Sequence, residues 1–170
     1  MRPRVDFAPL PVLCCASRRA SLVFVATRPE AIDDGFAAHI TALDLSHRIV
    51  PGFSMLMKVR PELVVENAFD ALHFSPVHQV LETPQMRVVQ SEHGFTAEGM
   101  FLLPASQWQS GDRENVAVPF RATAFGPTIV VSSLGGARPY EVITGAHGRT
   151  SGTNVTISMA LPRGMPVPDN

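Results

Sequence analysis

Large apolar residues occupy every second position near the end of the chain. In the segment 153–161, Val155, Ile157 and Met159 alternate with smaller or more polar residues. Such alternation predicts a strand with one face toward the core. Shorter β-rich segments, separated mostly by Gly, Pro, Asn or Asp, predict further strands over residues 85–91, 95–103, 117–125, 128–134 and 140–146.

The first third of the chain carries the helical pattern. Residues 21–27 and 53–59 each predict a short strand. Between them, Pro29 opens a predicted helix that runs to about Leu43, with an apolar stripe that includes Phe36 and Ile40. Residues 1–20 show no clear period. Sequential strands with short connections predict an α+β fold, a meandering antiparallel sheet with helices packed on one side.

Composition narrows the class of protein. The 170 residues are 45% hydrophobic and 17% charged, with a net charge of −1, which indicates one globular domain and excludes a nucleic-acid footprint. No apolar run reaches the length of about 18 residues that a membrane helix needs. The only cysteines, Cys14 and Cys15, are adjacent, which indicates no disulfide framework and favours a cytoplasmic location.

The segment 64–80, VVENAFDALHFSPVHQV, concentrates the candidate chemistry. It contains Asn67 and Asp70 together with His73 and His78, which lie five positions apart. Two imidazoles and one carboxylate suit Fe(II) and leave open positions on it for oxygen chemistry. An ordinary amphipathic helix with two partly buried histidines is the alternative interpretation.

The spacing of this segment sets a geometric requirement. On one helix Asp70 and His73 share a face, whereas His73 and His78 diverge by about 140°. Pro76 disfavours the helical conformation at Ser75, so the helix is expected to end or kink there. We therefore expect the two rings to converge, with nitrogens about 3–4 Å apart.

The pattern Asp70-x2-His73-x4-His78, preceded by Glu66-Asn67, resembles the iron-binding segment of Rieske-type non-haem iron oxygenase alpha subunits. The branch that it resembles includes ketosteroid hydroxylases and vanillate-type demethylases. The resemblance extends over residues 21–170. It implies a helix-grip (START/SRPBCC-like) fold, in which a curved antiparallel sheet wraps around a C-terminal helix.

By this resemblance, His73 and His78 bind a mononuclear Fe(II). Asp70 carries electrons from a neighbouring subunit's Rieske cluster, and Asn67 lies close to the iron. The implied reaction hydroxylates or demethylates a hydrophobic aromatic, terpenoid or steroid-like substrate with O2. Electrons come from NAD(P)H through a ferredoxin or reductase. A homo-oligomer is implied, with no nucleic-acid or membrane partner.

Two departures from the family pattern affect this expectation. A 2Fe-2S Rieske cluster needs two Cys and two His ligands, and no such motif is encoded here. The family's third iron ligand is an aspartate on the C-terminal helix, whereas this sequence stops at Asn170, so Asp169 would serve only in a shortened domain. We expect residues 1–20 to be irregular or a Rieske-domain remnant and residues 21–170 to be a partial catalytic domain. This domain would lack its C-terminal helix and be inactive in isolation.

Other interpretations remain open. A metal-free domain that binds a hydrophobic ligand would keep the same fold without catalysis, and an inactive fragment would have neither function. A missing C-terminal helix would leave Val155, Ile157 and Met159 uncovered and so promote self-association. The remaining histidines, which are His39, His47, His93 and His147, are expected to be surface or hydrogen-bonded residues.

Overall fold

The computed structural model describes residues 12–16, 21–25, 34–91, 94–105, 115–136 and 139–165. Its first two strands, β1 (Val12–Ala16) and β2 (Ser21–Val25), form an antiparallel pair. The strand over residues 21–27 is thus confirmed in its first five positions. Residues 12–16, which lie in the segment expected to be irregular or a Rieske-domain remnant, form a strand.

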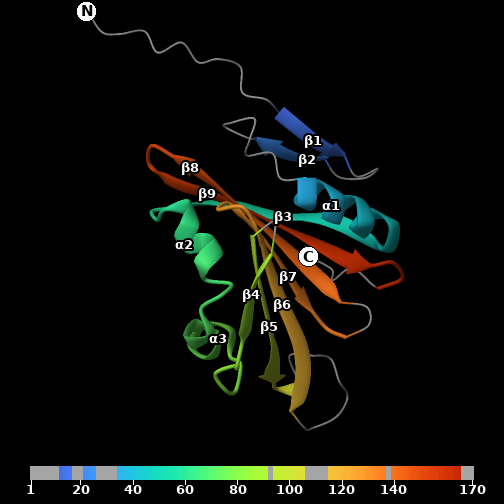
Figure 1. The fold of residues 1–170 in the computed structure, drawn as a ribbon, viewed down its shortest axis with the longest axis vertical. Helices are drawn as coiled ribbons and strands as arrows, with labels where there is room; N and C mark the ends of the chain where they lie inside the picture. The colour runs from blue at the N-terminus through green and yellow to red at the C-terminus, as the bar shows by residue number, and fades with distance from the viewer. Residues whose placement is uncertain are drawn as a thin grey trace, which may run out of the picture.

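Within the described residues, seven strands form one curved antiparallel sheet in the order β3-β9-β8-β7-β6-β5-β4 (Figure 1). The strands are β3 (His47–Met57), β4 (Arg87–Ser91), β5 (Gly94–Leu103), β6 (Val116–Phe125), β7 (Ile129–Leu134), β8 (Tyr140–Arg149) and β9 (Gly152–Pro162). The six strands from β4 to β9 follow one another as a meander, which confirms the sequence prediction. β3 then closes the order beside β9, with a register shift between Pro51 and Ser54.

Three helices accompany the sheet among the described residues: α1 (Asp34–Ser46), α2 (Pro61–Glu66) and α3 (Ala71–His78). α1 confirms the later part of the helix predicted from Pro29, and residues 29–33 lie outside the described residues. β3 starts at His47, immediately after α1 and earlier than the predicted start at Phe53. None of these helices is long and apolar enough to cross a membrane.

The helices pack on both faces of the sheet, so the expectation that they pack on one side is wrong. Val118 and Phe120 of β6 share a buried cluster with Val65 of α2 and Phe74 of α3. Phe125, at the end of the same strand, lies an odd number of residues after Phe120, so its side chain is on the opposite face of the sheet. It belongs to a second cluster. That cluster includes Phe36, Ile40 and Leu43 of α1. We call the two sides the α3 face and the α1 face.

A polar contact fixes α1 against its face. His39 lies 2.8 Å from the buried carboxylate of Glu141 on β8. Burial alone would raise the pKa of Glu141, but hydrogen bonds from His39 and Ser133, with the charges of His39 and His47, hold this pKa below its usual value. His47 is buried and donates from Nε2 to the main-chain oxygen of Pro139 at 2.8 Å. Both histidines are therefore hydrogen-bonded residues, as the sequence predicted.

Three aromatic rings hold α3 on its face. The Phe74 ring centre lies 4.7 Å from that of Phe101 and 5.2 Å from that of Phe120. The Phe101 and Phe120 rings stack on neighbouring strands with centres 4.3 Å apart. All three side chains are buried, whereas Leu72 and Val77 of the same helix are 74% and 63% exposed. Phe74 is thus the buried anchor of α3.

The uncovered strand face predicted from the sequence is only partly present. Val155 is buried, and Ile157 and Met159 are half-buried. α2 packs against β8 and β9. Exposed apolar side chains instead include Phe53 and Leu56 on β3, at the edge of the sheet.

The aromatic cluster should dominate the stability of the α3 face. Phe120→Ala removes a buried ring between two others, so we expect a loss of about 3–5 kcal/mol in the free energy of unfolding. The matched control, Phe53→Ala, changes an exposed ring and should alter stability by about 0.5 kcal/mol or less. Urea unfolding followed by circular dichroism measures both. Equal losses would contradict this account of the core.

Candidate functional site

Two short helices replace the single helix on which Asp70 and His73 were expected to share a face. α2 ends at Glu66, the chain turns through residues 67–69, and Asp70 begins α3 as its N-cap. The Asp70 side chain accepts a hydrogen bond from the Leu72 N–H at 3.0 Å. Aspartate favours this capping position because its oxygen satisfies a free helix N–H.

The same residue orients His73. The Nδ1 atom of His73 lies 2.7 Å from the main-chain oxygen of Asp70, to which it donates. In a neutral imidazole this leaves the lone pair on Nε2. Metal-bound histidines are commonly fixed in this way, with one ring nitrogen donating to a carbonyl and the other facing the ion.

The structure brings the rings of His73 and His78 together. Their centres are 5.1 Å apart and their planes meet at 77°. With bonds of about 2.1 Å and a ring centre about 1.1 Å behind each nitrogen, two imidazoles on one ion at about 105° would have centres about 5 Å apart. The separation of the ring centres is compatible with a shared metal ion, and it equally matches an ordinary edge contact between two rings.

A wide final turn explains how residues five apart can approach. α3 continues through Pro76 to His78, so the helix does not end at Ser75, where the sequence predicted an end or a kink. Proline lacks an N–H and removes one helical bond. The Gln79 N–H then bonds the Phe74 oxygen five residues back, whereas a regular α-helix bonds four back. A wider turn rotates each residue less, so His73 and His78 diverge by less than about 140°.

The environment of His78 favours its neutral form. The residue is exposed overall, but its ring centre lies 5.8 Å from that of Phe74. Partial burial, followed by repulsion from His73, lowers the pKa of His78 below its usual value of 6.5. A neutral imidazole is the form that binds metal ions.

The other predicted site residues do not complete a ligand set. Asn67 is exposed at the end of α2, and the Asp70 carboxylate caps α3. Asp169 and His93 lie outside the described residues, and His147 is exposed on β8. Over the described part of the chain, no group of three or more His, Cys, Asp or Glu residues could hold a metal ion.

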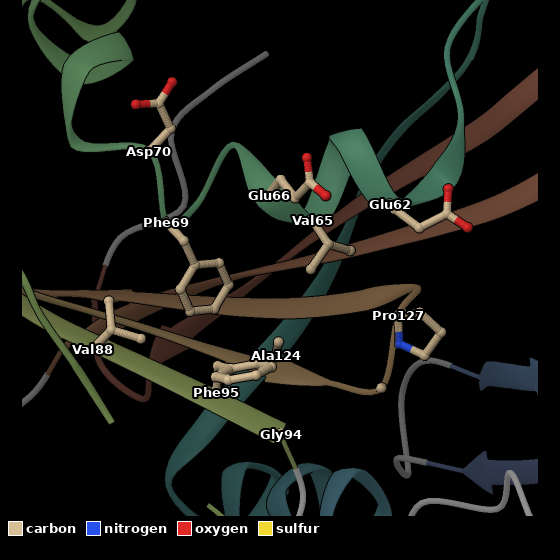
Figure 2. Close-up of a pocket in the computed structure, with 11 residues that line it drawn as sticks. Glu62, Val65, Glu66, Phe69, Asp70, Val88, Gly94, Phe95, Ala124 and Pro127 are labelled. Atoms are coloured by element: carbon tan, nitrogen blue, oxygen red, sulfur yellow. The ribbon is translucent and has the colours of Figure 1, made fainter. Parts of the chain in front are cut away.

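A cavity of about 640 Å³ lies between the α2–α3 segment and the sheet, and the sequence did not predict it. Figure 2 shows Val65 and Phe69 pointing from this segment toward Val88, Phe95 and Ala124. The lining is mostly apolar and includes Asp70 but neither His73 nor His78. Exposed apolar side chains such as Val88 and Phe95 are the signal of this cavity, although their exposure follows only from the fold.

Comparison with known proteins assigns no family. No protein-family model and no curated protein matches the chain. Among solved structures it is similar to SA2116, a protein of unknown function from Staphylococcus aureus, with 13% identity, coverage of 74% of this chain and 77% of that one, and a TM-score of 0.48. It is also similar to BexL, a di-domain ARO/CYC from the BE-7585A biosynthetic pathway. That match has 10% identity, covers 84% of this chain and 50% of BexL, and has a TM-score of 0.46.

The pKa of His78 offers a direct test of the paired rings. A folded-state pKa below the unfolded value means that the unfolded chain binds more protons between the two values, so stability falls as the pH drops below about 6.5. We expect His73→Gln to raise the pKa of His78 by removing the repulsion, while partial burial keeps it below 6.5. NMR titration of the His78 ring protons measures this shift. An unchanged or lower pKa would contradict the pairing.

Proposed function

We propose that this chain is the catalytic portion of a non-haem iron oxygenase, in which His73 and His78 are two ligands of a mononuclear Fe(II). The observation that carries the proposal is the 5.1 Å pair of imidazoles, one of which is oriented by a main-chain oxygen. The same proposal assigns the curved sheet to the helix-grip class.

His73 and His78 each have a feature that suits a ligand of iron. The Asp70 oxygen holds His73 with Nε2 free to bind, and the lowered pKa of His78 keeps its lone pair available at neutral pH. Bound there, Fe(II) would supply the activation of O2 that hydroxylation or demethylation requires. A third ligand, with Asp169 as the sequence candidate, would complete the set.

The cavity supplies a place for a hydrophobic substrate. Asp70 lines it, and the main-chain oxygen of the same residue accepts the hydrogen bond from His73. This single residue therefore connects the cavity to the histidine pair. An aromatic, terpenoid or steroid-like molecule would leave water for a mostly apolar wall.

The proposed enzyme needs partners for turnover. Electrons from NAD(P)H would arrive through a ferredoxin or reductase and a 2Fe-2S Rieske cluster that this sequence does not encode. Leu72 and Val77, exposed on the helix that bears both histidines, offer an apolar surface for a neighbouring subunit. We therefore propose a homo-oligomer whose isolated chain is inactive.

A metal-free domain that binds a hydrophobic ligand is the second candidate function. The observation in its favour is that neither His73 nor His78 lines the 640 Å³ cavity. A ligand could occupy this cavity without any chemistry at the histidine pair. The two candidates differ in whether the protein binds iron.

Iron binding separates these functions. In anaerobic titration, we expect the full chain to bind Fe(II) weakly, and His73→Ala or His78→Ala should reduce the affinity at least 10-fold, since even the loss of an outer hydrogen bond costs about 10–100-fold. After desalting, iron should fall below one equivalent, and NADH with a reductase should drive no oxygen uptake.

The matched control is His147→Ala, which removes an exposed histidine of β8 and should leave Fe(II) binding unchanged. Equal binding by the wild type and the His73→Ala, His78→Ala double variant would refute the iron site and favour the metal-free candidate. Stoichiometric iron after desalting would instead reveal a third ligand within the chain, and Asp169→Asn would be the first variant to examine.

A further inference from the structure

β3 forms one edge of the seven-stranded sheet (Figure 1). Among the described strands it pairs only with β9, and the register between them is continuous from Ser54 to Met57. The main-chain N–H and C=O groups on its other side therefore have no strand partner in the described part of the chain. Such an edge can accept an extended segment as a further strand, which is held by main-chain hydrogen bonds.

Edge strands are usually shielded from pairing, and only the first half of β3 carries such protection. Pro51 lies there and is followed by the register shift, and both features discourage the addition of a strand. Residues 53–57, FSMLM, contain neither proline nor a charged residue. Met55 and Leu56 are exposed neighbours, so their side chains point to opposite faces of the sheet. An added strand would therefore cover apolar surface on both faces.

Charge indicates which kind of segment fits this edge. Neither β3 nor β9 contains an Asp or Glu, and β8 contains only Glu141, which is buried. Lys58 and Arg60 follow β3 directly, and Arg149 ends β8 at the same end of the sheet. All three cations are exposed, and no ion pair is found for them within the described residues. The edge is therefore locally positive on a chain whose net charge is −1.

We propose that β3 binds an extended segment of an acidic partner protein as an additional, antiparallel strand. Carboxylates at the start of this segment lie beside Lys58 and Arg60, and the alternating apolar side chains that follow cover Met55 and Leu56. The direction follows because every strand pair in the described sheet is antiparallel, and an antiparallel segment begins opposite the end of β3. The inference goes beyond the proposed function and requires neither iron nor an occupied cavity.

Two other occupants fit this edge less well. A second copy of β3 would bring Arg48 and no carboxylate toward Lys58 and Arg60, and like charges on facing strands repel. An anionic lipid surface would leave the main-chain groups of the edge without hydrogen-bond partners in hydrocarbon. An acidic peptide strand matches both the charge and the main-chain groups.

Three synthetic peptides test the proposal on the full chain. The first has three acidic residues followed by alternating threonine and valine, the second has the reversed sequence, and the third is the first with every amide of its threonine–valine part N-methylated. We expect the first to bind and the second to bind about three- to tenfold more weakly, because exposed ion pairs contribute modestly. The third should not bind, since it lacks the main-chain donors. Fluorescence anisotropy of labelled peptides measures each dissociation constant, and higher salt should weaken the first.

Variants separate the contribution of charge from that of the apolar strand. Lys58→Gln with Arg60→Gln should weaken binding of the first peptide about three- to tenfold and remove its advantage over the reversed peptide. Leu56→Glu should weaken both peptides, because it replaces exposed apolar surface with a negative charge. The matched control is Arg87→Gln, which removes an exposed cation from β4 at the opposite edge of the sheet and should leave binding unchanged.

Several outcomes would overturn the proposal. These are the absence of peptide binding, equal binding of the first and reversed peptides, and binding that survives the loss of Lys58 and Arg60. Self-association that Leu56→Glu abolishes would assign the edge to a second copy of the chain, and binding to phosphatidylserine vesicles in place of the peptide would assign it to lipid. Iron binding at His73 and His78 would still stand or fall by its own titration.

Discussion

The packing of Phe74 against Phe101 and Phe120 is the contact on which the candidate site depends. α3 is only eight residues long, and short isolated helices are marginal in water. Its flanking residues Leu72 and Val77 are exposed, so they gain little from burial. The Phe74 ring therefore fixes the helix, and with it the direction in which His73 and His78 project. Loss of this anchor would weaken the positioning of both imidazoles, although His73 also has its hydrogen bond to the Asp70 oxygen.

The two ends of α3 also help to position His73 and His78. α2 ends at Glu66, and Asp70, the N-cap of α3, uses its carboxylate and its main-chain oxygen for two different partners, Leu72 and His73. Pro76 removes a hydrogen bond at the other end, and Gln79 closes the helix in the left-handed conformation, with φ at 57°. The approach of the two rings thus results from interruptions of helical order. A regular helix would have separated them.

The sequence predicted β4 to β9 well because each of these strands carries its own local signal, whereas β3 starts at His47 rather than at the predicted Phe53. Alternation in β9 and glycine-bounded β-rich segments in β5 to β8 place strands within a few residues of the observed bounds. The distribution of helices over two faces was not predictable in this way. This distribution follows from Phe120 and Phe125 facing opposite sides of β6. The two faces of the sheet exist only after the strands have paired. The wide turn at the end of α3 was likewise not predicted.

The histidine pair and the cavity differ in how sequence specifies them. His73 and His78 are near neighbours in the chain, so the local sequence suggested that their rings lie close together, although they do so within a helix that does not end at Ser75. The cavity instead joins α2, β4, β5 and β6, whose lining residues span Glu62 to Pro127. No local pattern can encode such a volume, because it exists only between surfaces that long-range pairing brings together. Asp70 belongs to both features, since it lines the cavity and its main-chain oxygen accepts a hydrogen bond from His73.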